Sequence, residues 1–564
     1  MRRLEHPNPQ FERKNWQNLN GQWQFEIDNS ISGRERGLIE AQNLSGEITL
    51  PFCPESILSG IGRTDFINAV WYKKIISISP EQLDGRIFLH IGASDYYTEI
   101  WVNAKSAGTH KGGYASFSFD ITTLLKPGEN IITVCAEDNV RNPLQPRGKQ
   151  SETYASRVCD YTRTTGIWQT VWLEFTPREY IKDFKITPCA AAGSVEMSVQ
   201  LAGAGDLSAK VFYDGSIMGE CAINNCRQSV NFSIKLNEIH LWELGCGRLY
   251  DVELKFGEDT VHTYFGLRDI ALNEKGLMLN GKHIFQRLVL DQGFYPDGIY
   301  TAPEDASFLK DIELSLAAGF NGARLHQKAF EPRFLYHCDK MGYMVWGEYG
   351  NWGMDYSDMR ALPNMLMEWL EILNRDYNHP SIVCWCPFNE TWDYAGRRQD
   401  DDMVRTVYRA TKQLDGMRPC IDTSGNFHVQ TDIFDVHDYE QNVEVFKERY
   451  DLLFKTGELF DKYAHRQPYT GEPVLMSEYG GTTIRFKDNA WGYGQPVEDE
   501  AQFLKRYEGL TTALLDNPKM IGFCYTQLYD IEQEQNGLYT YDRQPKVDIE
   551  AIRRINTKKA AMED

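Results

Sequence analysis

Residues 381–391 read SIVCWCPFNET, and this stretch decides the fold. An unbroken apolar run from Ile382 to Cys386 is typical of a strand buried on both faces in a parallel sheet. Asn389 and Glu390 follow the run directly, at what would be the carboxyl end of the strand. Barrel enzymes place their chemistry at these strand ends. The stretch therefore predicts one strand of a (β/α)₈ barrel with Glu390 at its mouth.

The same pattern recurs through the C-terminal half of the chain. Apolar, strand-like runs are predicted at His283–Leu290, Gly322–Leu325, Tyr343–Trp346, Ile382–Cys386, Cys420–Thr423, Ile433–Val436, Val474–Met476 and Met520–Tyr525. Helical patterns fall between most of them, at Asp305–Ala318, Pro332–Lys340, Pro363–Asp376, Asp401–Leu414 and Glu498–Leu515. Strands that alternate with helices in this number predict a TIM barrel catalytic domain over residues 269–564.

The residues before the barrel predict β-structure throughout. Short runs punctuated by turn residues occur at Gly21–Ile27, Ile75–Ile78, Arg86–Ile91, Tyr97–Val102, Asn130–Ala136 and Gln169–Phe175. They predict a jelly-roll-like, sugar-binding β-sandwich over residues 1–177. Further runs at Val195–Leu201, Ala209–Tyr213, Gln228–Ile234 and Leu249–Phe256 predict an immunoglobulin-like sandwich over residues 178–268. The expected fold is multidomain, with two all-β sandwiches followed by the barrel.

Composition excludes several classes of partner. The net charge is −21 and no block of Lys or Arg stands out, so nucleic acid is not expected as a partner. No apolar segment follows the two arginines near the N-terminus, and no run approaches the ~18 apolar residues of a membrane span. The cysteines lack metal-ligand spacing, and we expect no metal or cofactor. Without an export signal, the prediction is a cytoplasmic protein with reduced thiols.

Carboxylates follow several of the predicted barrel strands. Glu348 follows the third strand, Glu390 the fourth, Glu440 the sixth and Glu478 the seventh. Strand ends four and seven face each other across a barrel mouth, where two carboxylates can flank one glycosidic bond. A retaining glycosidase needs such a pair about 5–5.5 Å apart, and the charge of one keeps a proton on the other. A single strand-end Glu is more often a salt-bridged carboxylate, but the set as a whole favours catalysis.

Three motifs carry a resemblance to a known family: CWCPFNET at 384–391, VLMSEYGG at 474–481 and GIWQTVWLE at 166–174. They resemble glycoside hydrolase family two, the family of β-galactosidases, β-glucuronidases and β-mannosidases, and the likeness covers nearly the whole chain. The resemblance implies a retaining exo-β-glycosidase with Glu390 as acid/base and Glu478 as nucleophile. β-Galactosidase leads because it is the commonest activity in the family. The alternatives are a β-glucuronidase or β-galacturonidase, a β-mannosidase, an arabinosidase, or a carbohydrate-binding protein without activity.

The resemblance also implies substrate-binding roles for further strand-end and loop residues: Asn389, Tyr439, Asp160, Arg324, Glu348, His326, His437, Asp291, Trp491 and Asn536. Asn389 would bind the sugar 2-hydroxyl, Tyr439 would support the nucleophile, and the sandwich domain would lend Asp160 to the site. For Arg324 and Glu348, an ion pair with each other is an equal alternative to sugar contact. For Asp160 the alternative is a salt bridge within its loop, and for the remaining residues it is packing, solvent exposure or a structural cap.

The sequence departs from the family pattern at two places. Family β-glucuronidases carry an Asn-x-Lys pair that binds the sugar carboxylate; here Asn536 is present, but Leu538 stands where Lys is expected. A uronic substrate therefore lacks its expected cation, unless Arg163 or another loop residue replaces it. The large β-galactosidases have a His three residues after the strand-two Arg, where this chain has Gln327. A carbohydrate or glycoconjugate substrate and a homo-oligomer are what the resemblance suggests.

Overall fold

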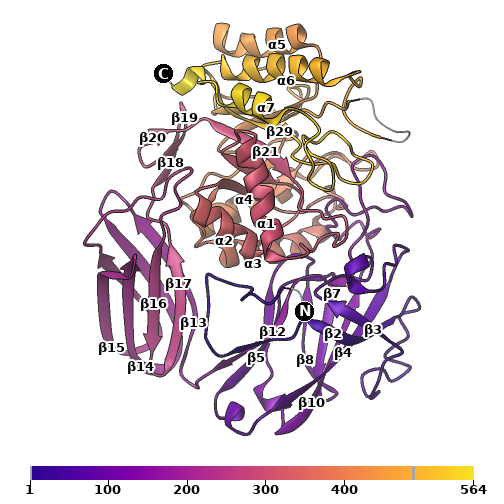
Figure 1. Cartoon of the computed structure of the whole chain (residues 1–564), viewed down its shortest axis with the longest axis vertical. Coiled ribbons are helices and arrows are strands. Elements are labelled where there is room, and N and C mark those ends of the chain that lie inside the picture. The colour runs from indigo at the N-terminus through magenta and orange to yellow at the C-terminus, as the bar shows by residue number, and fades with distance from the viewer. Residues whose placement is uncertain (1–2, 485–489, 564) are drawn as a thin grey trace.

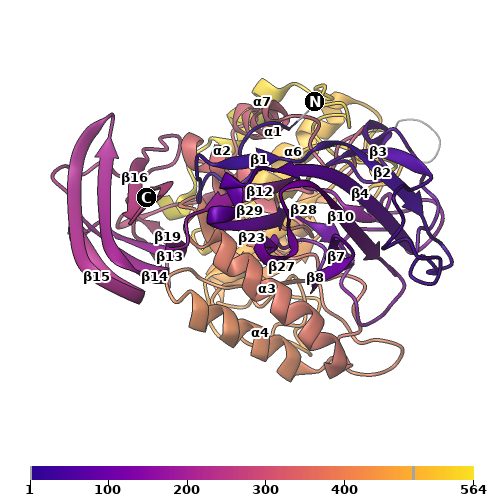
Figure 2. The ribbon, with the colours of Figure 1, turned by 90° about the horizontal axis from the view of Figure 1, so that it is seen from below.

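The computed structural model describes residues 3–484 and 490–563. In Figure 1 the N-terminal β-structure and a second β-unit lie side by side beneath a parallel sheet that is covered by helices. Figure 2 shows the same arrangement from below. No helix within the described residues is long and apolar enough to cross a membrane. The chain is thus a multidomain protein with two β-rich parts followed by an α/β part.

The N-terminal part contains two antiparallel sheets. One has the order β1-β12-β5-β9, formed by Trp16–Asn18, Val171–Thr176, Arg86–Ile91 and Phe117–Asp120. The other has the order β3-β2-β4-β10-β7-β8, formed by Gly46–Leu50, Gly21–Ile27, Ala69–Ile78, Gly128–Glu137, Tyr97–Val102 and Lys105–Lys111. Alternate residues of both sheets, such as Leu89 on β5 and Val134 on β10, enter one shared hydrophobic core. Jelly-roll connectivity stays a prediction.

The second β-unit is one antiparallel sheet of five strands: β13 (Tyr180–Cys189), β14 (Ser194–Tyr213), β15 (Ser216–Lys235), β16 (Tyr250–Phe256) and β17 (Asp259–Phe265). The two strands predicted at 195–201 and 209–213 form the single strand β14, so that prediction was wrong. Gly203 has a φ of +91°, and the register with β15 shifts on both sides of Gly205, so the glycines bend the strand without ending it. The immunoglobulin-like assignment and the domain boundaries stay predictions.

The C-terminal part is built on a parallel sheet with the order β24-β23-β22-β21-β29-β28-β27. In that order the strands are Ile382–Cys386, Met344–Glu348, Gly322–Leu325, Gln286–Asp291, Met520–Thr526, Val474–Gly480 and Phe434–Asp438. The helices are α1 (Asp305–Ala317), α2 (Pro332–Met341), α3 (Leu362–Asp376), α4 (Asp401–Leu414), α5 (Val443–Lys455), α6 (Glu500–Leu515) and α7 (Ile549–Asn556). Five of these helices were predicted to within two residues at each end, and α5 and α7 were missed. A small antiparallel sheet, β18–β20 (Ile270–Asn273, Gly276–Leu279, Lys282–His283), precedes the barrel strands.

The fifth barrel strand differs from its prediction. The run at 420–423 was expected to be a regular strand, but only a bridge at Cys420 and the two residues Thr423–Ser424 of β26 pair with the fourth-strand segment. The ladder breaks where the fourth-strand segment contains Pro387, which has no backbone N–H to donate. On the facing segment, the Asp422 carboxylate accepts hydrogen bonds from the backbone N–H groups of Val429 and Gln430. β26 instead pairs with β25 (Phe388–Asn389), which places it directly beside Glu390.

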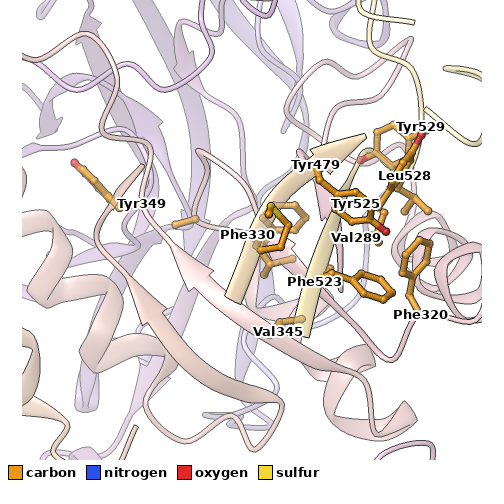
Figure 3. Close-up of a cluster of buried hydrophobic side chains, with 14 of the residues drawn as sticks. Val289, Phe320, Phe330, Val345, Tyr349, Tyr479, Phe523, Tyr525, Leu528 and Tyr529 are labelled. Carbon is orange, nitrogen blue, oxygen red and sulfur yellow. The ribbon is translucent and has the colours of Figure 1, made fainter. Parts of the chain in front are cut away.

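Buried apolar side chains hold the strands in place (Figure 3). Val289 on β21, Val345 on β23 and Phe523 on β29 are fully buried in one cluster with Tyr479 and Tyr525. The Tyr479 ring meets the Phe523 and Tyr525 rings edge-on, with centroids 5.7 and 5.5 Å apart. This packing fixes the carboxyl ends of the strands, where the candidate site lies.

A loop of the N-terminal part, residues 138–165, completes one wall of the barrel mouth. The backbone N–H groups of Arg147 and Gly148 donate to the carbonyls of Trp352 and Gly350, at 2.7 and 3.1 Å. Gly148 has a φ of +57°, and a side chain there would meet the Tyr114 hydroxyl and a barrel carbonyl. The glycine therefore permits the close approach of this loop to the barrel.

Candidate active site

Glu390 lies immediately after β25 at the mouth of the barrel. Its backbone has a φ of +44°, in the left-handed region, and its N–H donates to the carbonyl of Ser424 at 2.8 Å. Non-glycine residues held in this region cost about 1–3 kcal/mol and cluster at functional sites. The Glu390 side chain is 24% exposed, so it borders an accessible space.

Glu478 lies within β28, and its side chain is 5% exposed. Its Oε1 accepts a hydrogen bond from Arg324 Nη1 at 3.0 Å, and its Oε2 accepts one from the Tyr439 hydroxyl at 2.5 Å. Burial and the charge of Glu478 raise the pKa of Tyr439 well above its usual range, so the hydroxyl stays protonated and donates. These bonds fix the orientation of the Glu478 carboxylate.

The two carboxylates meet at His437. One carboxylate oxygen from each of Glu390 and Glu478 and one ring nitrogen of His437 lie within 4.8 Å of one another. His437 Nδ1 is 2.8 Å from Glu390 Oε1 and 3.4 Å from Glu478 Oε2. Gly425 packs against this ring, and a Cβ at that position would lie 2.3 Å from Nδ1. The glycine thus makes room for a histidine between two acids.

This group shares protons unequally. Burial lowers the pKa of His437, but the charge of Glu478 and the hydrogen bond with Glu390 outweigh burial, so its pKa is raised above 6.5. Burial raises the pKa of Glu390, but the hydrogen bond and charge of His437 outweigh burial, so its pKa is lowered. In the empty site the shared proton therefore resides mainly on His437 and can pass to Glu390 across 2.8 Å.

Glu390, His437 and Glu478 are also the one group in the described part of the chain whose ligand atoms are spaced for a metal ion. Arg324 is fully buried and ion-pairs with Glu478 at 3.0 Å, so a positive charge already stands against this carboxylate. That arrangement favours use of the group as an acid–base pair.

Arg324 organises the floor of the site. Its Nε donates to Glu348 Oε2 at 2.5 Å and its Nη2 donates to Asn389 Oδ1. The structural alternative predicted for Arg324 and Glu348, an ion pair with each other, is therefore present. The Asn389 Nδ2 group is buried and makes no hydrogen bond to any described residue. An amide donor held by Arg324 but left without an acceptor is ready to bind a ligand oxygen.

His326, 2% exposed, lies with Nδ1 3.0 Å from Glu348 Oε1.

For four other predicted site residues, the contacts that the structure shows are with groups other than the two carboxylates. Asp291 accepts hydrogen bonds from the Tyr529 hydroxyl and the Gly293 N–H at 2.6 and 3.0 Å, which is the cap alternative. Asn536 donates to Glu534 at 3.0 Å. Trp491 and Asp160 lie in loops at the barrel mouth. The Trp491 ring packs against the Tyr493 ring with centroids 4.9 Å apart, and Asp160 Oδ1 is 3.5 Å from Arg147 Nη1.

A model of glycosyl hydrolases family 2, TIM barrel domain, matches residues 270–560, and a model of the sugar binding domain of the same family matches residues 61–177. The chain belongs to glycosyl hydrolase family 2. It is a glycoside hydrolase, as the resemblance predicted.

Named relatives of this family 2 protein cover most of its length. The β-glucuronidase of Canis lupus familiaris is 24% identical over 615 residues, 95% of this chain and 89% of the canine protein. The β-galactosidase of Thermoanaerobacter pseudethanolicus is 26% identical over 416 residues, 67% of this chain and 52% of that protein. A protein of Formosa agariphila is 27% identical over 439 residues, 73% of this chain and 50% of that protein. The chain thus spans about half the length of the Thermoanaerobacter and Formosa proteins.

Solved structures share the whole fold. A β-glucuronidase from an uncultured Clostridium species superposes with a TM-score of 0.82 at 22% identity, covering 99% of this chain and 100% of that one. The Faecalibacterium prausnitzii β-glucuronidase gives 0.80 at 22% identity, with 96% and 98% covered. At such identities the likeness establishes the fold and the order of its parts.

The structure also locates the two residues that bear on a uronic substrate. Leu538, in place of the expected lysine, is fully buried in the barrel core. Arg163, the alternative cation, donates through Nη1 and Nη2 to the carbonyls of Ser151, Thr153 and Thr64. Neither side chain offers a positive charge to the site of this family 2 protein.

Several residues at the site were missed from the sequence. Tyr493 stacks on Tyr439 with centroids 3.4 Å apart, and the Trp352 indole N–H donates to the Asn389 carbonyl at 3.1 Å. Lys149 lies over the Trp352 ring, and Glu534 accepts from the Tyr161 hydroxyl. These residues come from irregular loops, where no periodic pattern marks them.

Proposed function

We propose that this family 2 protein is a retaining exo-β-glycosidase with Glu390 as acid/base and Glu478 as nucleophile, and that β-D-glucuronides are its preferred substrate class. The observation that carries the mechanism is the separation of the two carboxylates. Their oxygens lie within 4.8 Å. Retaining enzymes need about 5–5.5 Å, and inverting enzymes about 6.5–9.5 Å to admit a water molecule.

In the first step Glu478 attacks the anomeric carbon and Glu390 protonates the leaving oxygen. Arg324 and Tyr439 hold Glu478 in position for the attack, because both donate hydrogen bonds to its oxygens. The unpaired Asn389 Nδ2 group supplies a donor for the sugar 2-hydroxyl, a contact that strengthens in the transition state. In the second step Glu390 removes a proton from water, which releases the sugar with its β-configuration retained.

The substrate class rests on relatives rather than on geometry. The canine and feline β-glucuronidases match about 95% of this chain over 89% of their own length, whereas the β-galactosidases of Thermoanaerobacter pseudethanolicus and Thermoanaerobacterium thermosulfurigenes match over about half of theirs. This balance favours the β-glucuronidase alternative over β-galactosidase, which the sequence placed first. A neutral β-galactoside is the second candidate, because Leu538 replaces the lysine expected in β-glucuronidases.

A panel of 4-nitrophenyl β-D-glycosides tests the proposal. The glucuronide should give the highest kcat/KM, ahead of the galacturonide, galactoside, glucoside and mannoside. Highest activity on the galactoside would replace the proposed substrate with the second candidate. Hydrolysis of none of them by the pure protein would contradict the catalytic proposal itself.

His437 should set the basic limb of the pH profile. Because its pKa is raised, it keeps the shared proton at pH values above 6.5 and can pass it to Glu390, so kcat/KM should fall only as pH rises through that raised pKa. In His437→Asn only the Glu390 carboxyl can hold the proton. The basic limb should then move to lower pH, by on the order of one unit. A limb that stays in place or moves upward would show that His437 does not hold the catalytic proton.

A further inference from the structure

Lys149 is a buried lysine without an acceptor. The residue is 4% exposed, and its ammonium makes no hydrogen bond or ion pair with any residue in 3–484 or 490–563. Its ammonium lies over the Trp352 ring, whose centroid is 3.9 Å from Nζ. Lysines of such low exposure are nearly always paired. Lys149 Nζ is not among the fully enclosed polar atoms, so it borders a space from which a ligand oxygen can reach it.

Lys149 belongs to the catalytic centre. Trp352, over which its ammonium lies, is hydrogen-bonded to the carbonyl of Asn389, the neighbour of Glu390. Burial lowers the pKa of Lys149, but the charges of Cys159, Glu534, Glu478 and Asp160 raise it, and the net pKa is above its usual range. Lys149 is thus a charged group close to the carboxylates of the site. None of those carboxylates, however, has an oxygen within 4 Å of its ammonium, the distance that defines an ion pair.

The backbone fixes Lys149 firmly in this position. Its carbonyl accepts a hydrogen bond from Tyr161 N–H at 2.7 Å, and the preceding Gly148 N–H donates to the Gly350 carbonyl at 3.1 Å. The first bond joins two parts of the 138–165 loop, and the second joins the loop to the barrel. A cation held this way is preorganised for a ligand rather than recruited by it.

We propose that Lys149 binds the carboxylate of a uronic acid in the sugar pocket and so determines the specificity of this enzyme for anionic β-D-glycosides. The inference rests on the proposed function. It identifies a cation from the sandwich domain for the task that Leu538 and Arg163 cannot perform. A carboxylate is the group that pairs best with a fixed, desolvated ammonium, whereas a neutral sugar leaves that ammonium with hydroxyl contacts only.

The test compares substrates that differ only at C6. Kinetic constants are measured for wild type, Lys149→Met and Lys149→Arg on 4-nitrophenyl β-D-glucuronide and β-D-glucoside, and on the galacturonide and galactoside pair. Lys149→Met should lower kcat/KM on the uronides about 10–100-fold, the value of a hydrogen bond to a charged group, and change the neutral substrates by less than about threefold. Lys149→Arg should keep part of the uronide activity. Arg163→Gln is the matched control and should affect both members of each pair equally.

Binding gives a second readout that needs no turnover. Titration of wild type and Lys149→Met with isofagomine and with its uronic acid counterpart should show selective weakening for the acid. An equal loss on acidic and neutral ligands would overturn the inference and make Lys149 a hydroxyl-binding or structural residue, with the proposed function intact. A wild type that cleaves only neutral glycosides would instead remove the substrate class proposed above, and the inference with it.

Discussion

Glu478→Gln should reduce kcat on any 4-nitrophenyl glycoside that the protein hydrolyses by on the order of 10⁵-fold or more, a loss typical of removing a catalytic nucleophile. The amide cannot form the glycosyl ester. The substitution keeps the shape of the side chain, and Arg324 keeps its ion pair with Glu348. Steady-state rates and a thermal melt of both proteins measure the effect.

Glu440→Gln is the matched control for this experiment. Glu440 follows Tyr439 in sequence, but its carboxylate pairs with Arg449 at 3.0 Å, away from the pair of catalytic acids. Its loss should leave kcat within about twofold, because surface ion pairs contribute little. A Glu478→Gln protein that is folded and retains more than a few per cent of wild-type kcat would refute the assignment of the nucleophile.

Glu390→Ala should lose about 10²–10⁴-fold in kcat/KM on substrates with poor leaving groups, the usual contribution of general acid catalysis. With a 2,4-dinitrophenyl glycoside the first step needs no acid, so the glycosyl-enzyme still forms. Its hydrolysis is then slow, because no base activates the water molecule. Azide fits the space left by the carboxylate and needs no deprotonation. It should therefore restore turnover and yield a β-glycosyl azide, which NMR identifies.

Glu478→Ala with azide distinguishes the two roles. Azide would then replace the nucleophile, attack from its face and give the α-glycosyl azide by a single inversion. If Glu390→Ala yields the α-azide, or no azide product although the protein is folded, the acid/base and nucleophile assignments must be exchanged or abandoned.

Much of the barrel could be predicted from the sequence because its strands are unbroken apolar runs. Gly322–Leu325 and Ile382–Cys386 coincide with β22 and β24. Strands buried on both faces of a parallel sheet appear in the sequence as short continuous apolar runs. The prediction of the fifth strand was wrong because its own apolar run does not show that the ladder breaks opposite Pro387, which has no backbone N–H to donate. In the second β-unit, glycines that signal a turn instead bend the long strand β14.

The site could be predicted where residues stand at the carboxyl ends of strands. Glu390, Glu478 and Arg324 do so, and the structure brings them together. Lys149 could not be predicted, because a lone Lys in a loop carries no signal until the fold buries it. The role of His437 as a bridge between two acids depends on a close approach at Gly425, which is a three-dimensional property.

Covalent trapping of the intermediate tests the central claim most directly. Incubation with a 2,4-dinitrophenyl 2-deoxy-2-fluoro-β-D-glycoside should stop the enzyme after the first step, because the fluorine slows hydrolysis of the glycosyl ester. Peptide mass spectrometry should then find one sugar on the carboxylate of Glu478. A sugar on Glu390 or on another residue, or stoichiometric release of dinitrophenol with no labelled peptide, would contradict the account.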